Sequence, residues 1–359
     1  MAKVRVLVIE DSLTMRQRLI EILQRDPDLE VVAQAEDGKR GIELCRDLRP
    51  DVITLDMVMP QMSGLAATEY IMAYFPTPIV IVSASTNRGD LFRTWEAVGA
   101  GAVEVLEKPR GDASDEEWER NFRFTVKVAA RVKVITHPRL RLSAQRARLP
   151  SGATPIFAAG EGGGRAQLLA IGASTGGPGA LVELLHGFDG RLKLPVLLVI
   201  HLSELFGASF ADWLDGQSSL RVRYVVDGEP LPPPGVGQIL MAPPNRHLVV
   251  EKGRLKLTRE AERHSCRPSV DVLFDSLARQ LGERVAACLL TGMGKDGAEG
   301  LLAIRRAGGF TVAQDEATSV VFGMPREAAA IGAAMQVLPL EPIAPALLTA
   351  TPAELRSRS

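Results

Sequence analysis

One serine stands among four glycines in the stretch Ile171-Gly-Ala-Ser174-Thr-Gly-Gly-Pro-Gly179. The segment matches G-x-S-x-G and lies between an apolar run and a predicted helix. Such a turn can present a serine hydroxyl at a sheet edge, and the N–H groups at the helix start can stabilise an anion. Glycine-rich strand-to-helix turns also cradle pyrophosphate, so this stretch alone leaves a nucleophile and a phosphate cradle equally open.

A serine nucleophile needs a base nearby. Among the five histidines, His201 directly follows the apolar run Val196–Ile200, which places it at the carboxyl end of a predicted strand, the edge where Ser174 is expected. Its alternative role is a capping histidine ahead of Ser203. Of the others, His137 is expected in a linker and His186 near a helix end. His247 and His264 are expected to be substrate contacts or surface residues.

A carboxylate that could orient the base follows a third apolar run. The glycine-rich loop Thr291-Gly-Met-Gly-Lys-Asp296-Gly297 places Asp296 where it could hold the imidazole of His201 in the correct tautomer and stabilise its cation. Asp315, at another strand end, is a rival, and the ordinary role of Asp296 would be a cap for the helix predicted to begin near Ala298. The chain order Ser, His, Asp differs from that of α/β-hydrolases, so the motif is no argument for that fold.

A second group of polar residues ends the strands predicted in the first part of the chain. Glu10 and Asp11 end the first strand, and Asp56 ends the third. In an open α/β sheet these strand ends meet at the topological switch point. Three carboxylates in one cleft repel one another unless a hard cation such as Mg²⁺ neutralises them. Ser83 and Lys108, at the next two strand ends, are suited to hold phosphoryl oxygens.

The order and spacing of these residues resemble a response-regulator receiver domain. The motifs that carry the resemblance are Glu10-Asp11, Leu55-Asp-Met-Val-Met-Pro60, Ser83-Ala84 and Lys108-Pro109. The resemblance implies that Asp56 accepts a phosphoryl group from a histidine kinase. It also implies a Mg²⁺ ion held by Glu10, Asp11, Asp56 and the Val58 carbonyl, with Ser83 and Lys108 reading the phosphate. Val105 stands where receivers often carry an aromatic switch residue, which puts the usual rotamer coupling in question.

The region from Gln167 to about Leu340 resembles the catalytic domain of the chemotaxis methylesterase (CheB) family. The motifs are Gly172-Ala-Ser-Thr-Gly-Gly177, His201, Ser209-Phe-Ala211, Arg267-Pro-Ser-Val-Asp-Val-Leu-Phe274, Thr291-Gly-Met-Gly-Lys-Asp-Gly297, Gln314-Asp315 and Gly323-Met-Pro325. The resemblance implies a triad of Ser174, His201 and Asp296, a Met293 N–H as oxyanion donor, and no metal for ester hydrolysis. The chain reads His201-Leu-Ser203 where family members commonly read His-Met-Pro.

The apolar pattern predicts two α/β domains. The first, 1–130, is a five-stranded doubly wound, flavodoxin-like receiver with strands at Val4–Ile9, Val31–Ala35, Val52–Leu55, Ile79–Val82 and Val103–Leu106. A linker, basic and rich in Pro and Gly, is expected at 131–165. The second domain, 166–349, is expected to be doubly wound and mostly parallel, and a frayed tail at 350–359 is expected to follow.

The second domain has seven predicted strands and four predicted helices. The strands are expected at Gln167–Ile171, Val196–Ile200, Arg221–Val226, Gln238–Met241, Val285–Leu290, Phe310–Gln314 and Met335–Leu338, and the helices near 178–187, 203–214, 269–281 and 298–307. The stretch HLVVEKGRLKLTR, turning at Gly253, predicts an inserted β-hairpin.

Composition narrows the function classes. The net charge of −1 disfavours nucleic acid as a partner, and three cysteines without close pairing argue against a disulfide framework or zinc cluster and fit a reducing cytoplasm. No apolar run is long enough for membrane insertion. Together with these limits, the two resemblances imply a cytoplasmic, phosphorylation-regulated esterase that removes methyl groups from glutamate methyl esters of chemoreceptors and deamidates receptor glutamines. The alternatives are a non-catalytic module that docks receptors through a degenerate hydrolase domain and, third, a nucleotide-binding enzyme.

Overall fold

A computed structural model describes residues 2–84, 87–109, 115–132, 165–188 and 190–352. The chain divides into two compact units, residues 1–153 and 154–359. Most of the predicted linker and the last seven residues of the predicted tail lie outside the described residues.

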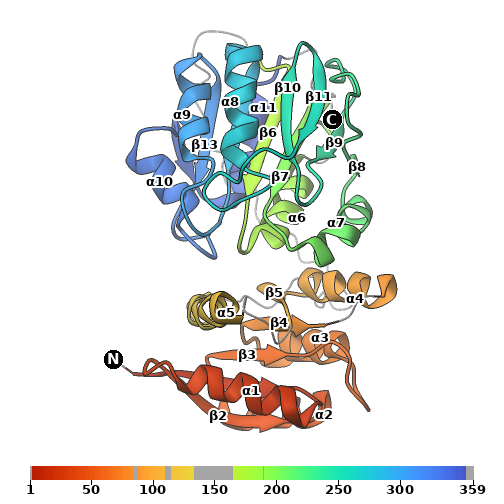
Figure 1. Ribbon diagram of the computed structural model, residues 1–359, viewed down its shortest axis with the longest axis vertical. Coiled ribbons are helices and arrows are strands. Elements are labelled where there is room, and N and C mark those ends of the chain that lie inside the picture. Colours follow the sequence, from red (N-terminus) through yellow and green to blue (C-terminus); the bar gives the residue numbers. More distant parts are fainter. Residues whose placement is uncertain (1, 85–86, 110–114, 133–164, 189, 353–359) are drawn as a thin grey trace, which may run out of the picture. The chain divides into compact units, whose positions relative to one another are not determined.

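The first unit is a five-stranded parallel sheet in the order β2-β1-β3-β4-β5 (Figure 1). Its strands are β1 (Val4–Ile9), β2 (Leu29–Ala35), β3 (Val52–Leu55), β4 (Ile79–Ser83) and β5 (Glu104–Glu107). Its helices are α1 (Leu13–Gln24), α2 (Gly38–Leu48), α3 (Gly64–Tyr74), α4 (Arg88–Gly99) and α5 (Asp115–Ala129). The order confirms the predicted flavodoxin-like receiver fold.

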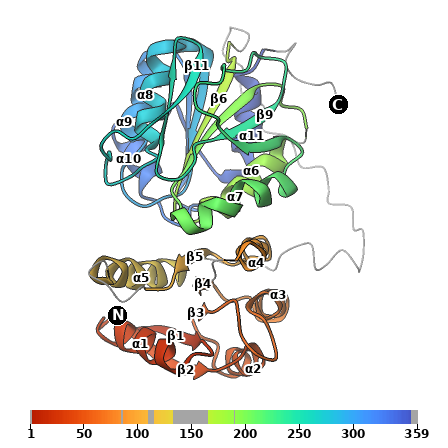
Figure 2. The ribbon, with the colours of Figure 1, turned by 45° about the vertical axis from the view of Figure 1, so that its right-hand side comes forward.

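The helices cover both faces of this sheet, α1 and α5 on one and α2, α3 and α4 on the other (Figure 2). Strands buried on both faces read as continuous apolar runs, and every residue of β3 and β4 is buried. Four of the helices are preceded by an N-cap residue whose side chain accepts a hydrogen bond from the backbone N–H three residues later in the chain. This bond satisfies one of the free donors of the first turn. These N-caps are Ser12, Asp37, Ser63 and Asn87.

The second unit holds a seven-stranded sheet in the order β14-β13-β12-β6-β7-β9-β8, and every pairing in it is parallel. Its strands are β6 (Leu168–Ala173), β7 (Pro195–Ile200), β8 (Arg221–Tyr224), β9 (Gln238–Met241), β12 (Val285–Leu289), β13 (Phe310–Gln314) and β14 (Gln336–Leu338). The predicted hairpin is confirmed as β10 (His247–Glu251) and β11 (Arg254–Thr258), which form a separate antiparallel sheet. The helices are α6 (Gly177–Phe188), α7 (Glu204–Gln217), α8 (Val270–Gln280), α9 (Ala298–Arg306), α10 (Met324–Ala330) and α11 (Leu340–Thr349), with a 3₁₀ turn at Gly282–Arg284.

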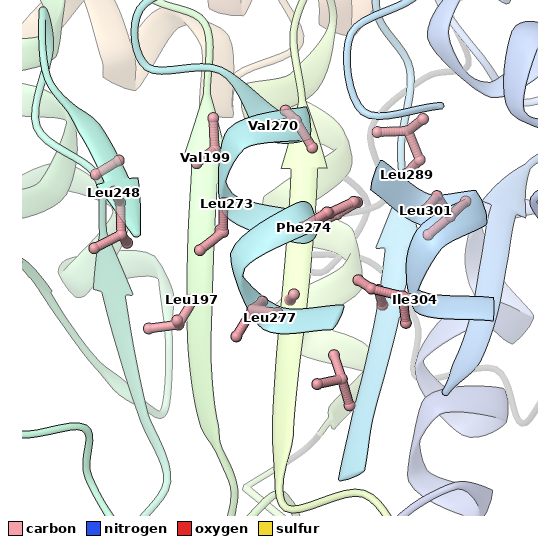
Figure 3. Close-up of a cluster of buried hydrophobic side chains, with 14 of the residues drawn as sticks. Leu197, Val199, Leu248, Val270, Leu273, Phe274, Leu277, Leu289, Leu301 and Ile304 are labelled. Atoms are coloured by element: carbon pink, nitrogen blue, oxygen red, sulfur yellow. The ribbon is translucent and has the colours of Figure 1, made fainter. Parts of the chain in front are cut away.

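Helix α8 supplies much of the core on one face of this sheet. Its apolar side chains point at the strands and at α9 (Figure 3). The labelled members of this cluster come from α8, α9, β7, β10 and the end of β12: Val270, Leu273, Phe274, Leu277, Leu301, Ile304, Leu197, Val199, Leu248 and Leu289. Because α8 is fixed by this packing, the first turn of α8 is a rigid platform at the carboxyl end of the sheet.

The structure adds two helices that the sequence pattern did not predict. Helix α10 is short, and α11 contains Pro345, a residue that ordinarily interrupts a helix.

The packed part of the unit also runs past the predicted end at residue 349. The carbonyl of Ala350 accepts the N–H of Ala166, and Thr351 is buried, so the predicted frayed tail is wrong for these two residues. Among the described residues, no helix has the length and apolar character needed to cross a bilayer.

Candidate active site and candidate phosphorylation site

Strand pairing brings the candidate nucleophile and the candidate base to one edge. In the sheet register Ala173, at the end of β6, lies opposite Ile200, at the end of β7. The next residues are Ser174 and His201, and the N–H of His201 donates to the carbonyl of Ala173 over 3.1 Å. On the other side, the N–H of Ser174 donates to the carbonyl of Thr291 over 3.0 Å. This edge between β6 and β12 is the topological switch point of the sheet, where ligands of open α/β sheets bind.

The glycines around Ser174 allow a tight turn and a close approach. The N–H of Gly177 donates to the carbonyl of Ser174 over 2.7 Å, and Gly176 has φ +75°, the conformation that a type II turn requires at its third residue. A Cβ on Gly292 would lie 2.8 Å from the Cβ of Ser174, so only glycine lets the loop after β12 pass this close. The turn therefore supports the strand-to-helix elbow expected from G-x-S-x-G.

Asp296 joins His201 to the start of α8. Its Oδ2 lies 2.9 Å from Nε2 of His201 and accepts the Val270 N–H over 2.7 Å. Its Oδ1 accepts the Ser269 hydroxyl over 2.7 Å and the Asp271 N–H over 3.1 Å. The carboxylate thus orients the imidazole and also caps the positive end of α8. The expected cap of the helix near Ala298 is wrong, because the N-cap of α9 is Gly297 and no side chain makes a cap bond there.

The pair is electrostatically coupled. Burial favours the neutral acid at Asp296, but the hydrogen bond and charge of His201, helped by Ser269 and Val270, hold the pKa of Asp296 below its usual value. Burial disfavours the imidazolium, yet the bonds to Asp296 and Cys266 and their charge outweigh it and raise the pKa of His201 to about 9. The geometry therefore strongly stabilises a protonated base, the state that forms after proton abstraction.

Sequence reasoning missed Cys266, which faces the other ring nitrogen. Its Sγ lies 3.8 Å from Nδ1 of His201. Since Asp296 engages Nε2, Nδ1 is the nitrogen left to accept a proton. In the part of the chain that the structure describes, the hydroxyl of Ser174 makes no hydrogen bond to His201. Catalytic hydrogen bonds are often long or unformed in ligand-free sites. The one feature of the sequence that could have pointed to Cys266 is its position directly before the Arg267-Pro motif.

Two backbone N–H groups near Ser174 are available to an oxyanion. Met293 is 48% exposed, and within the described residues its N–H has no hydrogen-bond partner. The N–H of Thr175, the residue after the candidate nucleophile, also has no hydrogen-bond partner within the described residues. The sequence reasoning did not single out Thr175.

Several alternatives from the sequence take other roles. Asp315 accepts the N–H and hydroxyl of Thr318, so it caps a local turn. His247 is fully buried between the Ser269 N–H and the Ala261 carbonyl, so the expectation of a substrate contact or surface residue is wrong.

The remaining positions fit structural roles. His186 is exposed in the last turn of α6, near the helix end where it was expected, and His137 lies outside the described residues. His264 binds Asp271 over 3.1 Å. Ser203, in the His-Leu-Ser departure, accepts the Phe206 N–H and is the N-cap of α7.

The receiver unit gathers its predicted residues at the ends of β1, β3 and β5. Nζ of Lys108 donates to Oε1 of Glu10 over 3.0 Å and to Oδ2 of Asp56 over 2.9 Å. Glu10 and Asp56 are buried and Asp11 is exposed, and one carboxylate oxygen from each lies within 4.8 Å of the others. Oδ1 of Asp56 accepts the N–H of Met57 over 2.7 Å.

The charges at this edge are poorly balanced without a further cation. Burial, and then the charge of Asp56, raise the pKa of Glu10 to about 7. Burial also raises the pKa of Asp56, although Lys108 opposes the shift, and the two carboxylates raise the pKa of Lys108 against its burial. Two buried carboxylates beside an exposed one are oxygen donors of the kind that Mg²⁺ prefers, so these residues fit the ion that the receiver fold implies.

The other predicted residues of this site lie at the same edge. Ser83 is the buried last residue of β4, and its carbonyl accepts the N–H of Lys108 over 3.0 Å. Val58 lies in the loop after Asp56 with an exposed side chain. Val105 is buried in β5 opposite Ile81, so the position of the usual aromatic switch is filled by a side chain packed into the sheet.

The folds and the two edges define a class: a response regulator that joins a receiver to an α/β unit with a Ser, His and Asp edge. The profile of the family described as CheB methylesterase matches residues 169–347, and the profile described as response regulator receiver domain matches residues 6–114. A curated relative is 42% identical over 96% of the chain, and the chain belongs to the CheB methylesterase family.

Two such relatives share 42% identity with this chain. One, of Anaeromyxobacter dehalogenans, aligns over 344 residues, and the other, of Pseudomonas aeruginosa, over 350; each alignment covers 96% of both proteins. Both relatives are named protein-glutamate methylesterase/protein-glutamine glutaminase 2. Among solved structures, the CheB methylesterase catalytic domain of Thermotoga maritima is 34% identical, with a TM-score of 0.48, over 52% of this chain and 99% of that one.

Proposed function

We propose that this chain hydrolyses methyl esters on glutamate side chains of chemoreceptors and converts receptor glutamines to glutamates. Relatives of the same two-domain length carry both activities in their names. The single observation that carries the chemistry is the 2.9 Å contact between Asp296 and His201, next to the strand end that bears Ser174. A base that is already oriented by a buried carboxylate is what a serine nucleophile lacks by itself.

In the proposed mechanism the proton of the Ser174 hydroxyl moves to Nδ1 of His201 while Oγ attacks the ester carbonyl. The N–H groups of Thr175 and Met293 stabilise the negative charge that develops on the carbonyl oxygen. The tetrahedral intermediate collapses, and methanol leaves with the proton from His201. Water then attacks the acyl-enzyme, His201 takes the water proton and returns it to Ser174, and the glutamate is released. With a glutamine side chain, ammonia leaves in place of methanol.

The receiver would regulate this reaction. Asp56 is the proposed phosphoacceptor, and a chemotaxis-type histidine kinase would supply the phosphoryl group. A Mg²⁺ ion would be held by Glu10, Asp11, Asp56 and the Val58 carbonyl. When bound, that ion neutralises the phosphoryl oxygens and the carboxylates around them. Lys108 would hold the phosphoryl group together with Ser83, and its contacts with both buried carboxylates support this role. The proposed place of action is the cytoplasm, where the receptor helices and the kinase would be reached.

The direct test is methanol release from the methylated receptors of the host. Membranes carrying methyl-labelled receptors are mixed with the full-length protein, with and without a small phosphodonor and Mg²⁺. We expect labelled methanol above the protein-free blank and a faster release with phosphodonor. Receptors with glutamine at the methylation sites, assayed for ammonia, test the deamidation arm. Receptor binding without methanol or ammonia would support the non-catalytic docking module instead.

A further inference from the structure

The thiol of Cys266, which the esterase mechanism does not use, lies beside the ring nitrogen of the candidate base that Asp296 leaves free. The Sγ of Cys266 lies 3.8 Å from Nδ1 of His201, the nitrogen that must accept the serine proton. Cys266 is half-buried, so a small solute can reach the pair. The thiol can also donate to the carbonyl of His264 over 3.4 Å, which fixes the direction in which it points.

The backbone that presents this thiol is held firmly. Arg263 and Cys266 exchange backbone hydrogen bonds of 3.3 and 3.0 Å, and the two residues between them, His264 and Ser265, have φ of 54° and 59°. This is the geometry of a two-residue hairpin turn in which both central residues are left-handed, although neither is glycine. Such a conformation is unfavourable for a residue other than glycine and persists only where the surroundings impose it.

Side-chain contacts from Arg263 and His264 impose that conformation. Arg263 binds the carboxylates of Asp275 and Glu299, the latter over 2.7 Å, while His264 binds Asp271 over 3.1 Å. These partners lie on α8 and α9, so the turn is tied to the packed core of the unit. The thiol is therefore delivered to His201 by a rigid support and not by a loose loop.

The spacing suits one kind of ligand. Zinc lies about 2.3 Å from a thiolate sulfur and about 2.0–2.1 Å from an imidazole nitrogen, so a tetrahedral ion holds these two atoms about 3.6 Å apart. The observed 3.8 Å separation needs almost no adjustment. A thiolate is a soft ligand and an imidazole a borderline one, and both favour zinc over the magnesium expected at the receiver edge.

Asp296 completes the arrangement as a supporting group. It lies close enough to be counted with His201 and Cys266 as a third ligand. Both of its oxygens are already engaged, however, since each accepts two hydrogen bonds, with His201 itself among the donors. A carboxylate that holds the other ring N–H of a metal-bound histidine is a recurring feature of zinc sites, and it fixes the tautomer that leaves the opposite nitrogen free for the ion.

We propose that Cys266 and His201 bind Zn²⁺ through Sγ and Nδ1, and that the bound ion inhibits the esterase. On binding, the thiol and, where it is protonated, Nδ1 of His201 release their protons to solvent; the sulfur and Nδ1 each give a lone pair to the ion, and water fills the remaining positions. With that lone pair engaged, Nδ1 cannot take the proton of Ser174. The inhibition rests on the proposed function, whereas the binding of the ion does not.

The other described thiols do not offer such a site. Cys45 and Cys288 are fully buried, so sulfur-specific signals report on Cys266. The cluster of His264, Asp271 and Glu299 also has metal-ligand spacing, but it has no sulfur, and Arg263 already binds its carboxylates. A cation bound there, or among the carboxylates of the receiver, would show only oxygen and nitrogen ligands.

The test measures binding and inhibition separately on the full-length protein, freed of metal and kept reduced with a phosphine. Binding is followed with Co²⁺, whose absorption shows a sulfur-to-metal charge-transfer band only when a thiolate is a ligand, and Zn²⁺ should remove this band. Methanol release is then titrated with Zn²⁺, each variant being normalised to its own metal-free rate. The variants are Cys266→Ser and Cys266→Ala, with Cys45→Ala as the control that removes a distant thiol.

We expect the charge-transfer band in the unmodified protein and in Cys45→Ala, and its loss in both Cys266 variants. The Zn²⁺ concentration for half-inhibition should rise at least about tenfold in those variants, the lower end of what even an outer-shell change costs in metal affinity. A band without any esterase activity would support the metal site and refute the proposed function. Active protein without the band, or inhibition equal in all variants, would overturn the metal site and leave the proposed function standing.

Discussion

At the scale of single residues, the account depends on Asp296, which links the candidate base to the first turn of α8. The carboxylate receives four hydrogen bonds, from His201, Ser269, Val270 and Asp271. A group so fully engaged has one stable orientation, and the imidazole inherits that orientation. This arrangement explains why the first turn of a helix far along the chain matters for a serine at the end of β6.

We predict that Asp296→Asn lowers the rate of ester hydrolysis about 10⁴-fold, because the amide spoils the tautomer of His201. The matched control is Asp315→Asn, which changes an acid at the end of a neighbouring strand that caps only its own turn. Its rate should stay within a few-fold of the unmodified protein. The measurement is methanol release under saturating substrate, and a crippled Asp315 variant beside a mild Asp296 variant would show that the wrong acid was chosen.

The pH dependence follows from the raised pKa of His201, about 9. Only the neutral imidazole can accept the serine proton, and its fraction grows as the pH rises toward that pKa. We therefore predict that kcat/KM increases about tenfold per pH unit near neutrality and levels off around pH 9. The assay contains a chelator, and the rate of Ser174→Ala is subtracted to remove alkaline ester hydrolysis. A profile that is already flat between pH 6 and 8 would contradict the raised pKa.

The sequence predicted the candidate site residues that end strands and missed candidates that sit on turns. Ser174, His201 and Asp56 each follow a buried apolar run, so their place at a sheet edge could be inferred. Cys266 reaches His201 only through a turn of two left-handed residues that are not glycine, and no local pattern announces that conformation. His247 is similar, because the burial of this residue depends on how the hairpin packs on α8.

At the scale of elements, strands were easier to predict than helices. The predicted strands differ from the observed ones by at most two residues at either end, because strands covered on both faces are apolar throughout. Helix α11 was missed since it begins at Leu340 and carries Pro345 in its interior. Tertiary packing overrides the local rule there, as α11 lies against α6 on one face of the sheet (Figure 2).

Two glycines give opposite predictions for the stability of the second unit. A Cβ on Gly300 of α9 would lie 2.6 Å from the Cβ of Phe274, so Gly300→Ala should push α9 from α8 and cost about 1–3 kcal/mol. A Cβ on Gly216 of α7 meets no atom within 4 Å, so Gly216→Ala should stabilise by about 0.4–1 kcal/mol. In calorimetry of the full-length variants, the unfolding transition of the second unit should move to lower temperature in Gly300→Ala and to higher temperature in Gly216→Ala. A shift in the same direction for both variants would contradict the prediction.

At the scale of the whole molecule, a receiver and an esterase share one chain, and each unit has its own sheet and core. The usual reason for this arrangement is regulation, in which phosphorylation shifts the population of an active state. A change from about 1% to 99% active would need roughly 5.5 kcal/mol of differential stabilisation. Val105 in place of an aromatic switch argues for a partial response.

We predict that a phosphodonor with Mg²⁺ raises methanol release by the full-length protein at least about fivefold, the lower end of ordinary coupling between sites. Asp56→Ala should abolish the response without lowering the basal rate, since Asp56 lies in the other unit. Asp47→Ala, which removes an exposed carboxylate of the same unit, is the control and should respond normally. An unchanged rate in all three proteins would mean that the receiver does not control turnover.

The most direct measurement of the central claim is the rate of methanol release by Ser174→Ala, compared with Thr175→Ala as the variant that removes the neighbouring hydroxyl. Both are assayed as folded full-length proteins on the same methylated receptors. The account predicts a fall of about 10⁴- to 10⁶-fold for Ser174→Ala, the usual loss for a member of a triad, and a change of a few-fold at most for Thr175→Ala. Turnover near the unmodified rate in Ser174→Ala would contradict it.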